Sequence, residues 1–198
     1  GDAWLCGEKL DEITHGPMAS LEKMFDLWGR LPEHLQTGDA ITACDGRVQE
    51  RGPTYSGIVG GLGRMFAGTA ARLAVALDEV DEERGLPGPG LILDVGAGSA
   101  VWSLEMIRRH PDARTTAMDL PEVLPHAEER ARALGLEQRL DIAPGDFFQV
   151  LPKERFHRVV LANVLHLEPA PEAGGLVRRF ARCLAPGGAM VIVDSMPG

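Results

Sequence analysis

A glycine-rich turn and an acidic residue further along the chain have the spacing of a nucleoside-binding site. The turn is Gly96-Ala97-Gly98, and Asp119 follows Gly98 by 21 residues. Two glycines let the backbone bend sharply and approach a ligand closely, because neither carries a Cβ. A carboxylate about 20 residues after such a turn can accept hydrogen bonds from the hydroxyls of a ribose. We therefore expect Gly96, Gly98 and Asp119 to hold a ribose-containing ligand.

The residues around this turn distinguish between nucleotide cofactors. A dinucleotide-binding turn carries a third glycine, which allows close helix packing beneath a pyrophosphate. Val101 occupies that position here, and the turn contains no basic residue. A ligand with a ribose and no phosphate, such as S-adenosylmethionine, suits these residues better. A nicotinamide-dependent oxidoreductase is the alternative that Val101 disfavours.

These residues require a parallel sheet to bring them together. After residue 90, short apolar runs alternate with amphipathic segments, and glycines or prolines separate them. Short connections between strand and helix favour a Rossmann-like, doubly wound α/β sheet, in which ligands bind at the carboxyl ends of the strands. The pattern predicts strands over 91–95, 113–118, 139–143, 159–164 and 189–193, and helices over 99–110, 122–134 and 172–184.

The chain changes character at residues 84–90, where two prolines and three glycines fall within seven residues. Such a segment cannot continue a helix, so it predicts a domain boundary. Upstream, apolar spacing predicts helices over 20–28 and 66–80, and residues 37–55 between them read as a loop. We expect two domains, a smaller helical one over residues 1–88 and the α/β domain over residues 89–198.

Composition excludes several classes of partner. The 198 residues include 20 Lys and Arg against 29 Asp and Glu, a formal net charge of −9. This acidic balance argues against nucleic acid or an anionic membrane as partner. The longest stretch without these charged residues, 52–63, is shorter than the ~20 residues of a membrane-spanning helix. Three widely spaced cysteines form no disulfide framework or metal-binding pattern, so we expect a cytoplasmic protein without a metal.

The predicted strand ends carry further motifs. They are Leu93-Asp94-Val95-Gly96-Ala97-Gly98, Asp119-Leu120-Pro121-Glu122-Val123, Gly145-Asp146-Phe147-Phe148 and Val164-Leu165-His166, with Pro186-Gly187-Gly188 downstream. These motifs resemble the S-adenosylmethionine-dependent O-methyltransferases of the caffeate and acetylserotonin type, especially their bacterial natural-product relatives. The Asp-Leu-Pro after the second strand is the most specific element. The resemblance implies a methyltransferase fold whose two final strands are absent from this chain.

The resemblance implies that three strand-end residues hold S-adenosylmethionine. Gly96 would lie against the methionine part of the cofactor. Asp119 would bind the ribose hydroxyls, and Leu120 would pack on the adenine ring.

Three further residues complete the implied cofactor site. Asp146 would accept a hydrogen bond from the adenine amino group, while Phe147 would cover the ring. The main chain of Ala162 would meet the amino-acid end of the cofactor. Simple core packing is the alternative for Phe147 and for its neighbour Phe148.

The resemblance also implies a general base. The histidine that matches His166 takes the proton of the acceptor hydroxyl in that family, and an acid that matches Asp194, 28 residues later, orients it. The alternatives for His166 are a structural histidine or a substrate clamp. Leu167-Glu168 departs from the Asp-Trp that usually follows, which leaves open a homologue that binds the cofactor without transferring methyl. A metal bound by Glu168 or Glu172 is not favoured.

We therefore expect a methyltransferase that acts on a hydroxyl of a small aromatic or polyketide-like metabolite. Only the resemblance favours oxygen over nitrogen or carbon as the acceptor atom. Because the family's leader helices join two subunits and cover the acceptor pocket, we expect a homodimer through residues 1–88. Candidates for dimer contact or acceptor lining, with core packing as the favoured alternative, are Met24, Phe25, Trp28, Met65 and Phe66.

Overall fold

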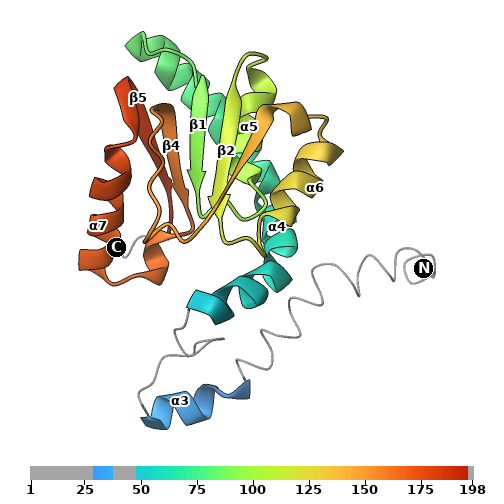
Figure 1. The fold of residues 1–198 in the computed structure, drawn as a ribbon, viewed down its shortest axis with the longest axis vertical. Helices are drawn as coiled ribbons and strands as arrows, with labels where there is room; N and C mark the ends of the chain where they lie inside the picture. Colours follow the sequence, from blue (N-terminus) through green and yellow to red (C-terminus); the bar gives the residue numbers. More distant parts are fainter. Residues whose placement is uncertain (1–28, 38–47, 196–198) are drawn as a thin grey trace, which may run out of the picture.

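The computed structural model describes residues 29–37 and 48–195 of the chain (Figure 1). Most of the helices and strands predicted within these residues begin and end within three residues of the observed ones. The exceptions are the helix predicted over 66–80 and the start of the strand predicted over 189–193. In chain order the elements are α3 (Leu31–Thr37), α4 (Val48–Arg84), β1 (Leu91–Val95), α5 (Val101–Arg109), β2 (Arg114–Asp119), α6 (Pro125–Ala133), η1 (Glu137–Arg139), β3 (Leu140–Pro144), β4 (Phe156–Ala162), η2 (Leu165–Leu167), α7 (Ala170–Ala181) and β5 (Leu184–Val193).

Five parallel strands form one sheet in the order β3-β2-β1-β4-β5. The first strand lies at the centre, and the chain builds the sheet outward from it, first to one side and then to the other. Helices α5, α6 and α7 make the crossovers from β1 to β2, β2 to β3 and β4 to β5. This arrangement is a doubly wound sheet, so the prediction of a Rossmann-like α/β fold is confirmed.

Each face of the sheet has its own hydrophobic core. On one face, Ile92 and Val160 pack with residues of α4, α5 and α6, including Trp102. On the other face, Leu93 packs with Phe180 of α7 (Figure 1). Successive side chains of a strand point to opposite faces, so strands that are apolar at every position become buried on both sides.

Helix α4 corrects one prediction. Residues 37–55 were predicted to form a loop, but α4 begins at Val48 and runs for 37 residues. Gly52-Pro53 interrupts the apolar spacing on which that prediction depended. Once a helix has formed, however, each further residue adds a hydrogen bond, and packing of the later turns against α5 stabilises the whole helix. The helix predicted over 20–28 lies outside the described residues, and no described helix has the length and apolarity needed to cross a membrane.

The carboxyl-terminal part of α4 is anchored to the sheet. Arg158 of β4 is 2% exposed and forms an ion pair with Asp81 of α4. Breaking a buried pair by removing one partner is strongly destabilising, because the other charge is left without compensation. Just beyond this anchor α4 ends at Arg84, within the predicted break, and Gly85 takes a φ of 61°.

Strand β5 also begins earlier than predicted. The sequence suggested that Pro186-Gly187-Gly188 ends a helix and that the strand follows, whereas β5 already starts at Leu184. The register between β4 and β5 shifts within this segment, which marks a bulge. A Cβ on Gly188 would lie 3.0 Å from three backbone oxygens, so the glycines permit the bulge instead of ending the pairing.

Candidate functional site

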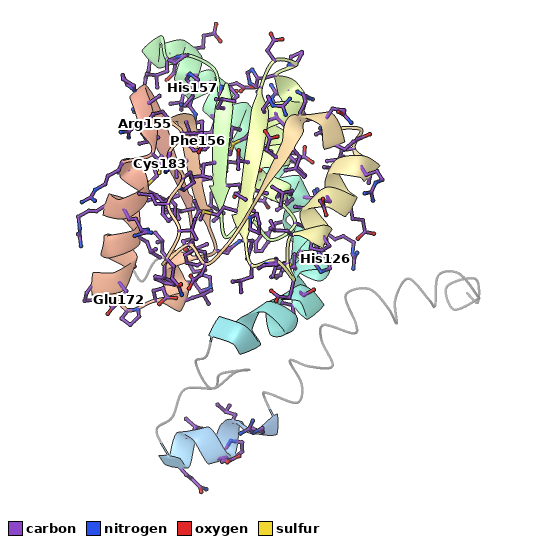
Figure 2. All side chains as sticks on the ribbon, in the orientation of Figure 1. His126, Arg155, Phe156, His157, Glu172 and Cys183 are labelled. Carbon is purple, nitrogen blue, oxygen red and sulfur yellow. The ribbon has the colours of Figure 1, made fainter. Side chains whose placement is uncertain are left out.

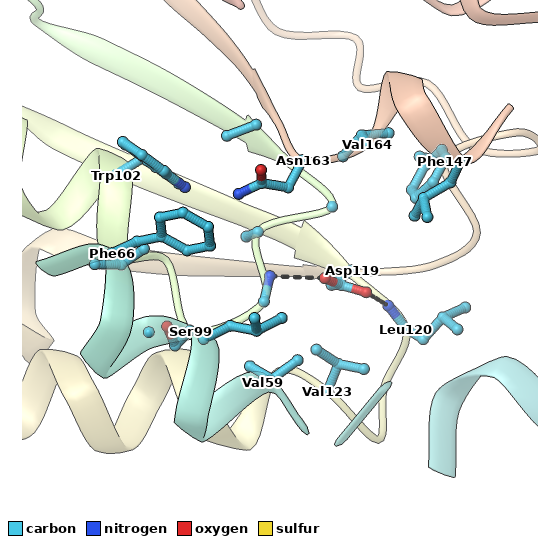
Figure 3. Close-up of a pocket in the computed structure, with 18 of the residues that line it drawn as sticks. Val59, Phe66, Ser99, Trp102, Asp119, Leu120, Val123, Phe147, Asn163 and Val164 are labelled. Carbon is cyan, nitrogen blue, oxygen red and sulfur yellow. Dashed lines mark hydrogen bonds between the residues drawn. The ribbon is translucent and has the colours of Figure 1, made fainter. Parts of the chain in front are cut away.

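The glycine turn after β1 is bonded directly to the end of β2. The backbone N–H of Gly98 donates to Oδ2 of Asp119 at 2.8 Å, and the N–H of Leu120 donates to Oδ1 at 2.7 Å (Figure 3). Gly96 and Gly98 have φ values of 64° and 56°, in the left-handed region that favours glycine. A Cβ on Gly96 would lie only 2.7 Å from Cγ2 of Val164, so this position has no room for a side chain.

The carboxylate of Asp119 is nearly buried, with 9% of the residue exposed. Burial raises the pKa of Asp119, while the hydrogen bonds from Gly98 and Leu120 act in the opposite direction. Each carboxylate oxygen accepts one backbone hydrogen bond and keeps a lone pair for another. The group is therefore fixed in place and can still accept from two hydroxyls.

A pocket lies at the carboxyl ends of β1, β2 and β4. Its empty volume, which includes the open mouth, is about 970 Å³. All the residues predicted to bind the cofactor line it, and their individual roles stay predictions. They are Gly96, Gly98, Asp119, Leu120, Asp146, Phe147 and Ala162.

The residues predicted to bind adenine follow β3. Oδ1 of Asp146 accepts from the N–H of Phe148 at 2.9 Å, and Oδ2 accepts from the side-chain amide of Gln149 at 3.0 Å. The rings of Phe147 and Phe148 have centroids 4.9 Å apart. Both rings line the pocket and also pack against the core on the α7 face. Binding and packing are therefore compatible at these two positions.

Helix α4 forms another wall of the pocket, which the sequence did not predict except at Phe66. A Cβ on Gly63 would collide with the side chain of Ser99, so glycine lets α4 approach the glycine turn. Arg130 of α6 donates to the carbonyl of Gly63 at 3.3 Å. Two turns earlier on α4, Oγ of Ser56 lies 3.0 Å from Nε2 of His126, a residue of α6 that is labelled in Figure 2. The α4 residues that line the pocket are Val59, Leu62, Gly63 and Phe66.

Trp102 and Asn163 are among the other lining residues that were not predicted. Trp102 packs against Phe66 with ring centroids 5.5 Å apart, and its position directly after Val101 on the helix that follows the turn was an available signal. Asn163 follows β4 and has a φ of 55°. Asparagine adopts this left-handed conformation more often than most residues, but the residue type alone does not reveal it.

Asp194 joins the ends of β4 and β5 through its buried side chain. Its Oδ2 accepts from the backbone N–H groups of Val164, Leu165 and His166 at 3.2, 2.7 and 3.3 Å. Its Oδ1 lies 2.5 Å from Nδ1 of His166 and accepts from the N–H of Ser195 at 2.8 Å. Burial alone would raise the pKa of Asp194, but the hydrogen bonds from Ser195, His166 and Leu165 outweigh it and hold the pKa below its ordinary value.

His166 stands beside the pocket and does not line it. The imidazole is 36% exposed, while the next two residues, Leu167 and Glu168, contribute to the lining. An ionised carboxylate can only accept, so Nδ1 donates to Asp194 and Nε2 keeps its lone pair. The structure thus brings the predicted pair together in a tautomer that suits a base, and catalysis by His166 stays a prediction.

The doubly wound sheet, with the glycine turn at the carboxyl end of its first strand, places the domain in the Rossmann-like class. Within that class, residues 92–188 match the family described as a methyltransferase domain, and this segment belongs to that family. The predicted cofactor, S-adenosylmethionine, agrees with this assignment.

The chain is similar to small-molecule O-methyltransferases. It is 30% identical over 183 residues to the tetracenomycin polyketide synthesis 8-O-methyl transferase TcmO of Streptomyces glaucescens, covering 88% of this chain and 50% of the relative. It is 34% identical over 143 residues to the 3-hydroxy-5-methyl-1-naphthoate 3-O-methyltransferase of Streptomyces sahachiroi, covering 70% and 39%. The resemblance stated from the motifs is therefore confirmed.

Solved structures support the same fold. A crystal structure of a protein from Nostoc punctiforme has a TM-score of 0.75 at 21% identity, over 88% of this chain and 52% of that one. At this identity the likeness concerns the fold alone. The chain spans half the length, or less, of these two curated relatives.

Proposed function

We propose that the protein transfers a methyl group from S-adenosylmethionine to a hydroxyl of a small aromatic or polyketide-like metabolite. The observation that carries the proposal is the convergence of all the predicted cofactor residues on one pocket of a methyltransferase domain. Two relatives add support, because one is named for the synthesis of a polyketide and the other for a hydroxynaphthoate.

The pocket residues suit this cofactor. Asp119 can accept from both ribose hydroxyls, and Leu120 and Phe147 offer apolar surface for an adenine ring. Val101 lines the pocket where a dinucleotide site would have a glycine, and no Lys or Arg is among the described lining residues. A phosphate would find no cationic partner there, whereas a phosphate-free nucleoside needs none.

The catalytic part of the proposal concerns one proton. S-adenosylmethionine, when bound, supplies an already activated methyl group, so the chain must position the acceptor and remove its hydroxyl proton. Asp194 holds the Nδ1–H of His166, so Nε2 would take the hydroxyl proton while the methyl group passes from the cofactor sulfur to the acceptor oxygen, leaving S-adenosylhomocysteine. In this scheme His166 is the general base and Asp194 is a positioning residue.

Two measurements test the proposal. Calorimetry with S-adenosylhomocysteine and with NAD should show binding of the first compound only, because the pocket suits a nucleoside without phosphate. Mass spectrometry of hydroxynaphthoates and phenolic polyketides incubated with S-adenosylmethionine should show the gain of one CH₂ unit. Binding of NAD in place of S-adenosylhomocysteine would contradict the cofactor assignment.

A second candidate is a homologue that binds S-adenosylmethionine without transferring its methyl group. The position of His166 outside the pocket lining favours it, together with Leu167-Glu168 in place of the Asp-Trp of the resembled family. Tight binding of S-adenosylhomocysteine with no methylated product across the acceptor panel would support this candidate. A methylated product would exclude it.

We also propose that residues 1–88 form a helical region that pairs two subunits and covers the acceptor pocket, with the α/β domain over residues 89–198. Support comes from Met65, which is 65% exposed on the part of α4 nearest the pocket. Sedimentation equilibrium of the full-length protein should give a dimer, and Met65→Glu should weaken it. A monomeric wild-type protein would contradict this arrangement.

A further inference from the structure

We propose that Asn163 determines acceptor specificity by binding a second oxygen of the acceptor, adjacent to the oxygen that is methylated. The inference rests on the proposed function and deepens it, because it narrows the acceptor to planar aromatic molecules with two neighbouring oxygens. Asn163 is the single asparagine of the sequence, and it lines the pocket.

The backbone fixes Asn163 firmly. Its φ of 55° is uncommon for a residue other than glycine. Its N–H donates to the carbonyl of Val193 at 2.8 Å, and the N–H of Val164 donates to Asp194 at 3.2 Å. A conformation of this kind persists only where the surrounding structure determines it, and such positions cluster at functional sites. The end of β4 is thus held in a defined position against the end of β5.

The side chain of Asn163 is available for a ligand. Its carboxamide is directed toward Trp102 within the pocket (Figure 3). No group of the described residues forms a hydrogen bond with this carboxamide. A carboxamide has two donor hydrogens and one acceptor oxygen, and in the partly exposed Asn163 they are open to a molecule that enters the pocket. A polar ligand group at this position would satisfy them.

The neighbours of Asn163 indicate which ligand it would meet. In Figure 3, Asn163, Trp102 and Phe66 lie at one end of the pocket, and Asp119 and Leu120 lie toward the other. The proposed ribose and adenine contacts are therefore at the far end from Asn163. The rings of Phe66 and Trp102, with centroids 5.5 Å apart and planes tilted by 38°, offer an aromatic surface for a flat molecule.

The position of His166, the proposed base, indicates where the second oxygen of the acceptor would lie. His166 follows Asn163 by three residues, on the segment that Asp194 holds by hydrogen bonds. A hydroxyl that loses its proton to His166 would have its ring neighbours close to the same segment. A second hydroxyl or a carbonyl on the adjacent ring carbon would then meet the carboxamide of Asn163, which can both donate and accept.

The test compares two neutral probes on the full-length protein saturated with S-adenosylhomocysteine. These are 2,3-dihydroxynaphthalene, with adjacent oxygens, and 2-naphthol, with one. Calorimetry should show the diol binding at least about fivefold more tightly to the wild-type protein, as expected for one net hydrogen bond. Asn163→Gly should abolish this preference without weakening 2-naphthol, because glycine accepts the positive φ and removes only the carboxamide.

Ala100→Gly is the matched control. Ala100 is the other described non-glycine residue with a positive φ, 52°, and it offers no side-chain hydrogen bond. This variant should keep the preference for the diol, and thermal unfolding should show that both variants fold.

The inference would be overturned if the wild-type protein showed no preference for the diol, or if the preference survived in Asn163→Gly. It would also be overturned if Asn163→Gly lost as much affinity for S-adenosylhomocysteine as for the diol. Failure of the wild-type protein to bind S-adenosylhomocysteine would be a different result, which overturns the proposed function together with the inference. Normal binding of that compound without a diol preference overturns the inference alone.

Discussion

Nδ1 of His166 lies 2.5 Å from Oδ1 of Asp194, although 28 positions separate the two residues in the sequence. The same carboxylate accepts the backbone N–H of Leu165 at 2.7 Å, within the 3₁₀ turn η2 that carries the imidazole. One side chain therefore shapes the turn and orients the ring. The proposed base depends on the fold of the β4–β5 edge as much as on its own chemistry.

Asp194→Asn should reduce both stability and turnover. An amide has one acceptor oxygen and carries hydrogens on its nitrogen, so it cannot accept from the backbone N–H groups and from Nδ1 of His166 together. We expect a loss of about 1–3 kcal/mol in the free energy of unfolding, measured by urea denaturation. Turnover should fall less than in His166→Ala. Asp141→Asn, at an exposed position, serves as control, and unchanged activity in Asp194→Asn would show that Asp194 does not orient the imidazole.

His166→Ala should lower turnover and leave cofactor affinity unchanged. A general base contributes about 10²–10⁴-fold, and the imidazole does not line the pocket in which the cofactor is proposed to bind. Turnover assays and calorimetry with S-adenosylhomocysteine separate the two effects. If turnover were equal to that of the wild-type protein, positioning alone would account for the reaction.

Asp119→Ala should weaken S-adenosylhomocysteine binding by at least about 10²-fold. It removes two hydrogen bonds to a charged acceptor, each of which contributes ~1.5–3 kcal/mol. Asp141→Ala is again a suitable control, because that carboxylate is exposed on β3 and does not line the pocket. Calorimetric affinity within a few-fold of wild type would reject the ribose assignment.

Two glycines of α4 should respond differently to the same substitution. Alanine is more favourable than glycine within a helix by ~1 kcal/mol. At Gly68 a Cβ would meet only the end of the Arg72 side chain at 4.0 Å, so Gly68→Ala should stabilise the protein by about that amount. At Gly63 the Cβ would collide with Ser99, so Gly63→Ala should lower the free energy of unfolding. Equal stabilisation by both variants would show that α4 does not need glycine to pack on the turn.

Stability should fall as pH rises from about 4 to 7 because of Asp94. Burial raises the pKa of Asp94 from 3.8 to about 7, and its Oδ2 has no hydrogen-bond partner among the described residues. In this range the folded protein keeps a proton that the unfolded chain releases, so the free energy of unfolding decreases with pH and levels off above pH 7. Urea denaturation at several pH values checks this. In Asp94→Asn the decrease should become smaller but remain, because burial also raises the pKa of Asp119. An unchanged slope would assign the whole effect to other groups.

The cofactor end of the pocket could be predicted because its residues follow strand ends. Parallel strands bring their carboxyl ends to one edge, so Asp119 and Asp146, after β2 and β3, must approach the glycine turn. The pairing of His166 with Asp194 followed from the same rule applied to β4 and β5.

The rest of the site depends on tertiary packing that local patterns do not record. The contact of Gly63 with the glycine turn joins segments on either side of the predicted domain boundary. The left-handed backbone of Asn163 is held by a hydrogen bond to Val193 at the end of β5, thirty residues further along the chain. No periodicity or motif in the sequence predicts either feature, so only the folded structure reveals them.

Helix α4 is bound to the rest of the domain at two points. Asp81 near its end forms an ion pair with Arg158, and the carbonyl of Gly63 beside the pocket accepts a hydrogen bond from Arg130. The 37 residues of the helix make a rod of about 55 Å, whose first turns project past the sheet (Figure 1). Four residues of the same helix, Val59, Leu62, Gly63 and Phe66, line the pocket. A molecule that binds the projecting turns and displaces them would therefore also change the pocket wall.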